Sequence, residues 1–177
     1  MLAYLFVVLA VAVRFIPHPF NATPLMASLL YFGARGPRRQ WWIPLAIIAA
    51  SDFVLTKFVY SYAFTWDHLV TFAWYGGILW LGTKLRDHVR PLPVVGASLT
   101  GSISFFLISN FAAWAAWTDM YPRTFNGVLA AYAAGLPFFR RGVQGDLFFT
   151  CVMFGLPALA GLLANSLDGT GGHSAAA

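Results

Sequence analysis

Long apolar stretches separated by short polar or turn-forming breaks run through the whole chain. Seven can be delimited, at residues 1–16, 22–34, 42–59, 68–83, 92–117, 125–139 and 147–165. A helix that crosses a bilayer needs about 20 predominantly apolar residues, and no fewer than about 17. The stretches 42–59, 92–117 and 147–165 meet that length. With flanking residues, 1–16 and 68–83 also reach it. The pattern predicts an all-α polytopic membrane bundle of about six transmembrane helices.

Basic residues between the stretches predict the side of the membrane on which each connection lies. Two clusters stand out: Arg35, Arg38 and Arg39, and further along Lys84, Arg86 and Arg90. Cytoplasmic loops of membrane proteins are enriched in Lys and Arg. Both clusters, and with them the N-terminus, are therefore predicted to be cytoplasmic.

The stretch 125–139 leaves two topologies open. It is short and interrupted by Gly135 and Pro137, which favours a re-entrant or interfacial helix, six spans and both chain ends inside. The pair Arg140 and Arg141 favours the alternative, because a seventh span would place that pair in the cytoplasm and the C-terminus outside. We favour six spans.

The composition of the chain is that of a membrane protein with one domain. Of the 177 residues, 59% are hydrophobic and 10% are charged, whereas about 25% are charged in an ordinary soluble domain. We predict a single transmembrane domain over 1–165 and a disordered tail over 166–177, which is rich in Gly, Ser and Ala. The net charge is +5, but it sits in short clusters between apolar runs, which indicates membrane topology and not nucleic-acid binding.

Asp52 lies near the middle of an apolar stretch and is the first candidate for a functional residue. Ser51 precedes it, and Thr56 follows four residues later on the same helical face. One interpretation is a contact with a substrate or cation, because carboxylates within a membrane are costly and often functional. The other is a buried carboxylate satisfied by Arg14 or by hydroxyl groups of a neighbouring helix. Arg14 lies near the outer end of its helix, where it could also reach the interface.

The segment 17–24 contains three prolines and cannot form a continuous helix. His18 and Asn21 supply polar groups within it. Irregular backbone at membrane depth is tolerated where it is buried or lines a cavity. The segment is therefore interpreted either as a wall over a ligand site or as an ordinary extracytoplasmic turn.

Asn110 and Trp114 are four residues apart and share a helical face. An amide beside an indole would suit a flat or ring-bearing ligand. Alternatively, the amide bonds across helices and the Trp belongs to an interfacial aromatic belt. We hypothesise a ligand pocket in the outer half of the bundle, lined by this face, by Asp52 and by the segment 17–24.

Small residues recur four apart near the start of the stretch 92–117. The pairs include Gly96 with Thr100 and Ala97 with Gly101. Such spacing lets helix backbones approach closely in membranes. We therefore interpret Gly96, Thr100 and Gly101 as packing residues.

No pattern of catalytic residues is present in the sequence. The chain contains no Glu, its four His are scattered, and no nucleotide-binding loop occurs. Cys151 is the single cysteine, which excludes an internal disulfide and any multi-cysteine metal site. We expect that the protein is not an enzyme and that it has neither a cofactor nor a metal site.

Four segments resemble an uncharacterised family of small bacterial integral-membrane proteins described as transport proteins. They are RFIPHPFNATPL (14–25), IPLAIIAASDFVL (43–55), GASLTGSISFFLISNFAAW (96–114) and YAAGLPFFRRGVQGDLFFT (132–150). That family in turn resembles the S-components of energy-coupling-factor transporters, which are six-helix membrane subunits that capture vitamins or metal ions from outside. The resemblance implies a location in the bacterial inner membrane, a small-molecule ligand, and a partner consisting of a transmembrane coupling subunit with ATPases.

Two functions from different classes follow from these observations. The first is a substrate-capturing subunit of an uptake system for a vitamin-like molecule or a cation. The alternative is a structural or assembly subunit of a larger membrane complex, with other membrane subunits as partners. A cavity lined by Asp52, Asn110 and aromatic residues would favour the first. A filled bundle with a wide apolar flank would favour the second.

Overall fold

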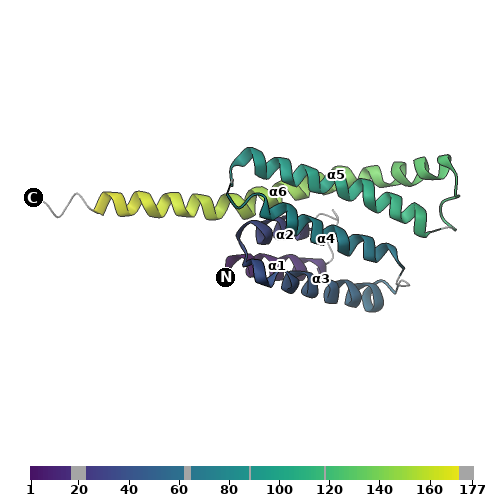
Figure 1. The fold of residues 1–177 in the computed structure, drawn as a ribbon, viewed down its shortest axis with the longest axis horizontal. Helices are drawn as coiled ribbons and strands as arrows, with labels where there is room; N and C mark the ends of the chain where they lie inside the picture. The colour runs from purple at the N-terminus through teal and green to yellow at the C-terminus, as the bar shows by residue number, and fades with distance from the viewer. Residues whose placement is uncertain (17–22, 62–64, 88, 118, 172–177) are drawn as a thin grey trace, which may run out of the picture.

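A computed structural model describes residues 1–16, 23–61, 65–87, 89–117 and 119–171, with side chains described as far as residue 166 (Figure 1). In these ranges the chain forms six α-helices and no strand. The helices are α1 (Leu2–Arg14), α2 (Leu25–Arg35), α3 (Trp42–Val54), α4 (Asp67–Thr83), α5 (Pro91–Ala116) and α6 (Phe125–Gly171). A π-helical segment, η2 (Leu55–Val59), continues α3, and a 3₁₀ turn, η1 (Arg38–Gln40), precedes it.

Three helical segments in the described part of the chain are long and apolar enough to cross a membrane. They are Arg38–Val59, Pro91–Ala116 and Phe125–Ser166, and each contains an 18-residue stretch whose mean hydropathy is 1.6, 1.7 and 2.1, respectively. α1 is apolar but shorter. The predicted all-α membrane helix bundle is confirmed, and the number of helices agrees with the prediction.

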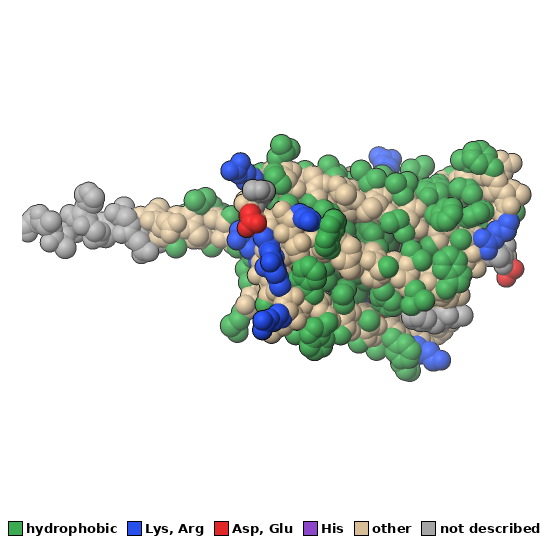
Figure 2. Space-filling model, in the orientation of Figure 1, with side chains coloured by type: hydrophobic (Ala, Val, Ile, Leu, Met, Phe, Trp, Pro, Cys, Tyr) green, Lys and Arg blue, Asp and Glu red, His purple; other side chains and the backbone are tan. Residues whose placement is uncertain are grey.

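The helices run alternately up and down, so that the two basic clusters, Arg35 to Arg39 and Lys84 to Arg90, lie at the same end of the bundle. Figure 1 shows the N-terminus and the start of α5 at this end, and α6 projects beyond it. Figure 2 shows blue Lys and Arg side chains collected there. Arg86 fastens this end, because its Nε donates a hydrogen bond to the Gly33 carbonyl at 2.9 Å and its guanidinium also contacts the Gly36 carbonyl.

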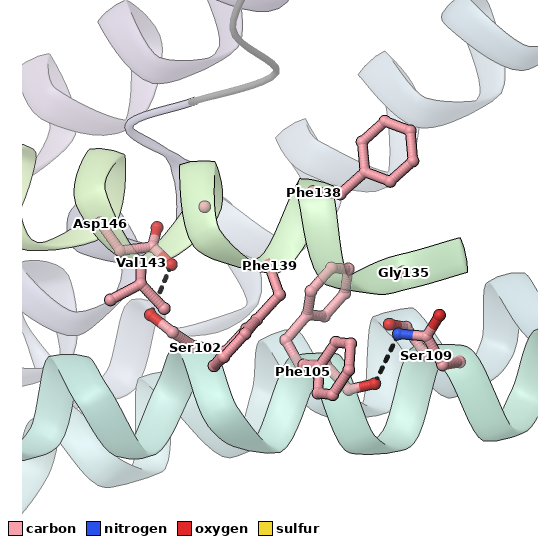
Figure 3. A pocket seen from close by; sticks show the side chains of 11 residues that line it. Ser102, Phe105, Ser109, Gly135, Phe138, Phe139, Val143 and Asp146 are labelled. Atoms are coloured by element: carbon pink, nitrogen blue, oxygen red, sulfur yellow. Dashed lines mark hydrogen bonds between the residues drawn. The ribbon is translucent and has the colours of Figure 1, made fainter. Parts of the chain in front are cut away.

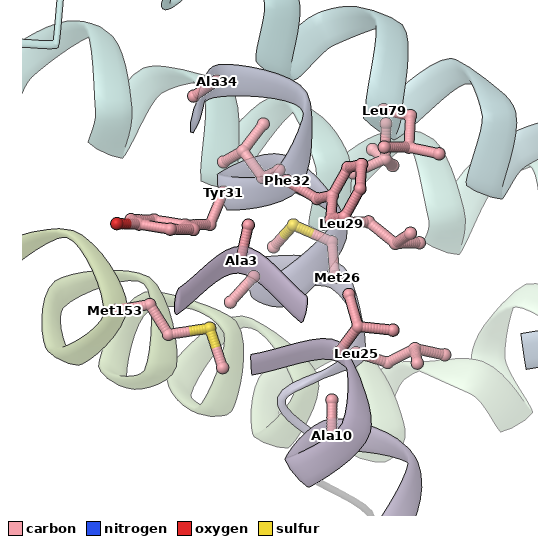
Figure 4. Packing of buried hydrophobic residues seen from close by; sticks show 14 of the residues in the cluster. Ala3, Ala10, Leu25, Met26, Leu29, Tyr31, Phe32, Ala34, Leu79 and Met153 are labelled. Carbon is pink, nitrogen blue, oxygen red and sulfur yellow. The ribbon is translucent and has the colours of Figure 1, made fainter. Parts of the chain in front are cut away.

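The core of the bundle is built around the short helix α2. All ten residues from Leu25 to Ala34 are buried, and α2 lies among α1, α4 and α6 (Figure 4). The Phe32 ring meets Tyr4 of α1 edge to face at 5.1 Å, and Tyr31 meets Phe154 of α6 at 5.0 Å. A helix enclosed by protein does not need the length of a lipid-exposed span, which explains why the apolar stretch 22–34 is short.

The last two apolar stretches belong to one continuous helix. α6 has 47 residues, so 125–139 is neither a separate span nor a short re-entrant helix. Pro137 and Pro157 both lie inside it. Proline is tolerated in membrane helices where neighbouring groups satisfy the freed backbone carbonyl. The helix continues to Gly171, past the start of the irregular tail predicted from 166, and residues 172–177 lie outside the described part.

The pair Arg140 and Arg141 lies within α6 and not in a loop. The hydroxyl of Tyr132 donates to the carbonyl of Leu107 at 2.7 Å, and Asp146 contacts Ser102. The two arginines fall between these contacts and are therefore opposite the middle of α5. Arg141 is exposed there. The pair therefore does not mark a loop between two spans, as the seven-span alternative assumed.

Candidate ligand-binding site

A cavity of about 300 Å³ lies between α5 and α6. Its polar lining includes Ser102 and Asn110 from α5 and Asp146 from α6. Its apolar lining includes four phenylalanines, Phe105, Phe106, Phe138 and Phe139. Figure 3 shows Asp146 and Phe139 directed from α6 toward α5. Ligand sites in proteins combine apolar walls with a few convergent polar groups in this way.

Asp146 is the ionisable side chain of this cavity. Its Oδ2 accepts a hydrogen bond of 2.7 Å from the hydroxyl of Ser102. Within the described ranges, Asp146 has no Lys, Arg or His at ion-pair distance. An ionised carboxylate that is enclosed in a membrane bundle is costly unless a cation compensates its charge. A cationic ligand in this cavity could supply Asp146 with the ion pair that the described residues do not.

Asp146 also borders a second, smaller cavity of about 130 Å³. This cavity is lined by Thr23, Trp74 and Tyr75, among others. Phe105, Gly142 and Asp146 line both cavities, so the two adjoin. The carboxylate consequently stands at the junction of an elongated space that reaches from the α5–α6 groove toward α4 and the beginning of α2.

Asn110 lines the larger cavity, but Trp114 does not. The Asn110 amide donates to the Phe106 carbonyl at 2.7 Å and lies against the backbone of Gly135, where a Cβ would overlap it. The Trp114 Nε1 donates to the Pro122 carbonyl at 3.0 Å, and Arg123 lies 5.3 Å from its ring centroid. Trp114 therefore fastens the α5–α6 connection beyond the cavity.

Asp52 lies on α3 and is paired with Arg14 of α1. The Arg14 Nη1 also donates to the Ser51 hydroxyl at 2.8 Å. The side chains of Arg14 and Asp52 are 17% and 10% exposed, so the pair is largely enclosed. Asp52 is not among the residues that line the two Asp146 cavities. Asp52 therefore has Arg14 as its ion-pair partner, the arrangement that the second interpretation from the sequence described.

His18 and Asn21 lie outside the described residues, since the structure does not describe 17–22. Thr23, from the same proline-rich segment, lines the smaller cavity. Of the three walls that the sequence hypothesis brought together, the described end of the proline-rich segment and Asn110 reach the Asp146 cavities, and Asp52 does not.

The small-residue pattern of α5 faces two directions. Gly101 is buried, and a Cβ there would lie 3.1 Å from both Ile78 and Met26. Gly96 and Thr100 instead lie on the exposed side of α5, and a Cβ on Gly96 would meet nothing within 4 Å. Gly101 is five residues from Gly96, so the two positions point to different sides of the helix.

Sequence reasoning missed Asp146, Ser102 and the phenylalanines of the cavity. Asp146 follows Arg140, Arg141 and Gln144, and these polar residues were interpreted as a loop between two spans. Recognising one helix would have placed a carboxylate within an apolar helix, which is itself a signal of function.

These features define the protein as an all-α membrane helix bundle with a polar, aromatic-lined cavity between its last two helices. The chain belongs to DUF6580, a family of unknown function whose model matches residues 1–167. None of the curated proteins and none of the solved structures matches the chain.

Proposed function

We propose that this protein is the substrate-capturing membrane subunit of a small-molecule uptake system, and that capture takes place in the Asp146 cavities. One observation carries the proposal: a carboxylate without an ion-pair partner in the described chain stands in a cavity of about 300 Å³. Small-molecule sites occupy about 300–1,000 Å³. Together with the adjoining 130 Å³, the space suits a compound smaller than most drugs.

The position of the cavity agrees with uptake. Its α5 residues, from Ser102 to Asn110, lie toward the end of α5 that is remote from the basic cluster. Basic ends of membrane proteins face the cytoplasm. We therefore place the N-terminus in the cytoplasm and the cavity in the outer half of the bundle, in the inner membrane of a bacterium. The resemblance to S-components suggests a transmembrane coupling subunit with ATPases as the partner.

Gly142 offers a direct test of capture. It lines both cavities, and a Cβ there meets no atom within 4 Å. Gly142→Leu therefore adds a bulky side chain to the cavity wall at a position where its first carbon has room. Gly161→Leu is the matched control, because it makes the same change on the same helix at an open position outside the two cavities.

The two variants and the wild type are placed in lipid nanodiscs and incubated with a small-molecule extract of the native host cells. Compounds that remain after washing are identified by mass spectrometry. We expect compounds that the wild type and Gly161→Leu retain and that Gly142→Leu loses. The same retained set in all three proteins would contradict capture in this cavity. Uptake of a retained compound is then compared between cells that express the wild type and cells that express Gly142→Leu.

A second candidate function, a subunit that assembles a larger membrane complex, is favoured by the outer surface of α6. Arg141 is exposed opposite the middle of α5. A guanidinium at the centre of a bilayer costs at least about 2.5 kcal/mol, and a carboxylate on a partner helix would relieve this cost. Four leucines farther along α6 are also exposed: Leu156, Leu159, Leu162 and Leu163.

Photocrosslinking separates this second candidate from a free-standing subunit. A crosslinking amino acid is placed at Arg141 and, as a control, at Leu69, which is exposed on α4. Protein adducts that form at 141 and not at 69 would support a partner helix on this side of α6. Adducts with lipid alone at both positions would contradict it.

A further inference from the structure

The chemistry around Asp146 narrows the class of compound. Resting on the capture function proposed above, we infer that the ligand is a small organic ammonium ion whose charged nitrogen sits beside the Asp146 carboxylate and whose apolar part lies among the phenylalanine rings.

Asp146 differs from the two ion-paired carboxylates of the described chain in having no cationic partner there. The ion pairs of the described residues occupy Asp52, with Arg14, and Asp67, with His68. Asp146 has the Ser102 hydroxyl at 2.7 Å as its polar neighbour, and a hydroxyl does not neutralise a carboxylate. A cationic ligand gains an ion pair in a site of low dielectric constant. An anionic ligand would be repelled, and a neutral one would gain no ion pair.

Aromatic rings line the cavity that Asp146 borders. Phe106 and Phe139 face each other across the α5–α6 interface, with ring centroids 4.6 Å apart. Phe105 lines both cavities beside Asp146 and packs on Trp74 with a centroid distance of 4.7 Å. Ring faces attract ammonium groups through their quadrupole, and most strongly where water is excluded. A carboxylate and such rings in the lining of one cavity are groups that attract organic cations.

The donor set separates an organic cation from a metal ion. In the described ranges, no three His, Cys, Asp or Glu side chains gather in a way that could hold a metal. Calcium and magnesium prefer about six or more oxygen ligands, whereas this cavity presents one carboxylate, an amide and hydroxyls among rings. Its volume of about 300 Å³ also exceeds what a single ion fills.

The test compares pairs of compounds that have the same shape but differ in charge. The probes are choline with 3,3-dimethyl-1-butanol, and 2-phenylethylamine with 2-phenylethanol. Binding to the protein in nanodiscs is measured by calorimetry, with empty nanodiscs as the blank. In at least one pair, we expect the cation to bind at least about tenfold more tightly than the uncharged compound of the same shape.

The preference should disappear in Asp146→Asn and persist in Asp119→Asn, which removes the same charge from an exposed position. Equal binding of cation and alcohol in both pairs, or an undiminished preference in Asp146→Asn, would overturn the inference. The comparison within the wild type needs no variant, so it remains decisive if Asp146→Asn does not fold. Neutral or anionic compounds retained from the cell extract would overturn the ammonium class while leaving capture intact. Retention of nothing by the wild type would overturn capture itself.

Discussion

Gly33 of α2 and Gly82 of α4 bring two helix backbones into direct contact. A Cβ on Gly33 would lie 2.9 Å from the Cα of Gly82 and would overlap the Leu79 carbonyl. A Cβ on Gly82 would lie 2.9 Å from the Cα of Gly33 and would overlap the Leu30 carbonyl. Because the atoms in the way are backbone atoms, no side-chain rotation can relieve the clash. The backbones of α2 and α4 can approach this closely because neither glycine has a side chain.

Gly82→Ala is expected to lower the free energy of unfolding by about 3 kcal/mol, because overpacking here must separate two helices. Gly77→Ala is the matched control on the same helix, since a Cβ there meets nothing within 4 Å. Thermal unfolding in detergent measures both. Equal midpoints for the two variants would show that α2 and α4 do not cross in this way.

Gly101→Leu is expected to destabilise the bundle by several kcal/mol. Its Cβ alone would lie 3.1 Å from the side chains of Ile78 and Met26, and the rest of the leucine would overlap them. Gly96→Leu makes the same change on the exposed side of α5 and should be tolerated. The fraction of monodisperse protein after solubilisation reports the difference. Loss of folded protein in both variants would mean that the exposed side of α5 is also a packing surface.

Arg14→Gln and Asp52→Asn are each expected to destabilise the protein by about 2 kcal/mol, because either one leaves its former partner unpaired in a largely enclosed place. The double variant should cost less than the two single variants added together. A double-mutant cycle from denaturation curves checks this. Strict additivity would show that the pair is energetically unimportant, and loss of ligand retention in folded Asp52→Asn would restore a binding role for Asp52.

Topology reporters test the membrane orientation. Fusions after Gly36, Arg86 and Ser166 should all report the cytoplasm, because the basic clusters lie at the end from which α6 projects. A fusion in the connection after Trp117 should report the outside. A periplasmic signal at Gly36 would show that the orientation is the reverse of the one proposed. A periplasmic signal at Ser166 alone would show that α6 crosses the membrane twice.

Hydropathy was sufficient to predict the helical class and the two central spans, since 42–59 and 92–117 correspond to α3 with η2 and to α5. It could not identify α2 as the enclosed helix. Local composition records how apolar a segment is, but not whether lipid or protein surrounds it. The contact between Gly33 and Gly82 joins residues far apart in the sequence, and no local spacing indicates it.

The candidate site was only partly predictable for a related reason. Asn110 was identified because an amide in an apolar helix is conspicuous. Asp146 was not, because nearby arginines and Pro137 resemble a loop although they are compatible with a helix that has neighbours on one side. The choice of Asp52 followed a sound rule about buried charge, but that rule does not tell a carboxylate with a partner from one without.

The continuity of α6 has a mechanical consequence. The helix carries Gly142 and Asp146 in the cavity wall and extends about 70 Å in all, from its 47 residues. Any tilt of the projecting end of this helix would therefore also move the wall of the cavity. Between the cavity wall and the projecting end, Pro157 lacks the amide that would bond the carbonyl four residues earlier, so the helix has one hydrogen bond fewer there. Pro157→Ala would restore this hydrogen bond. A tilt of the projecting end would then move the cavity wall more directly, although residue 157 does not line the cavity.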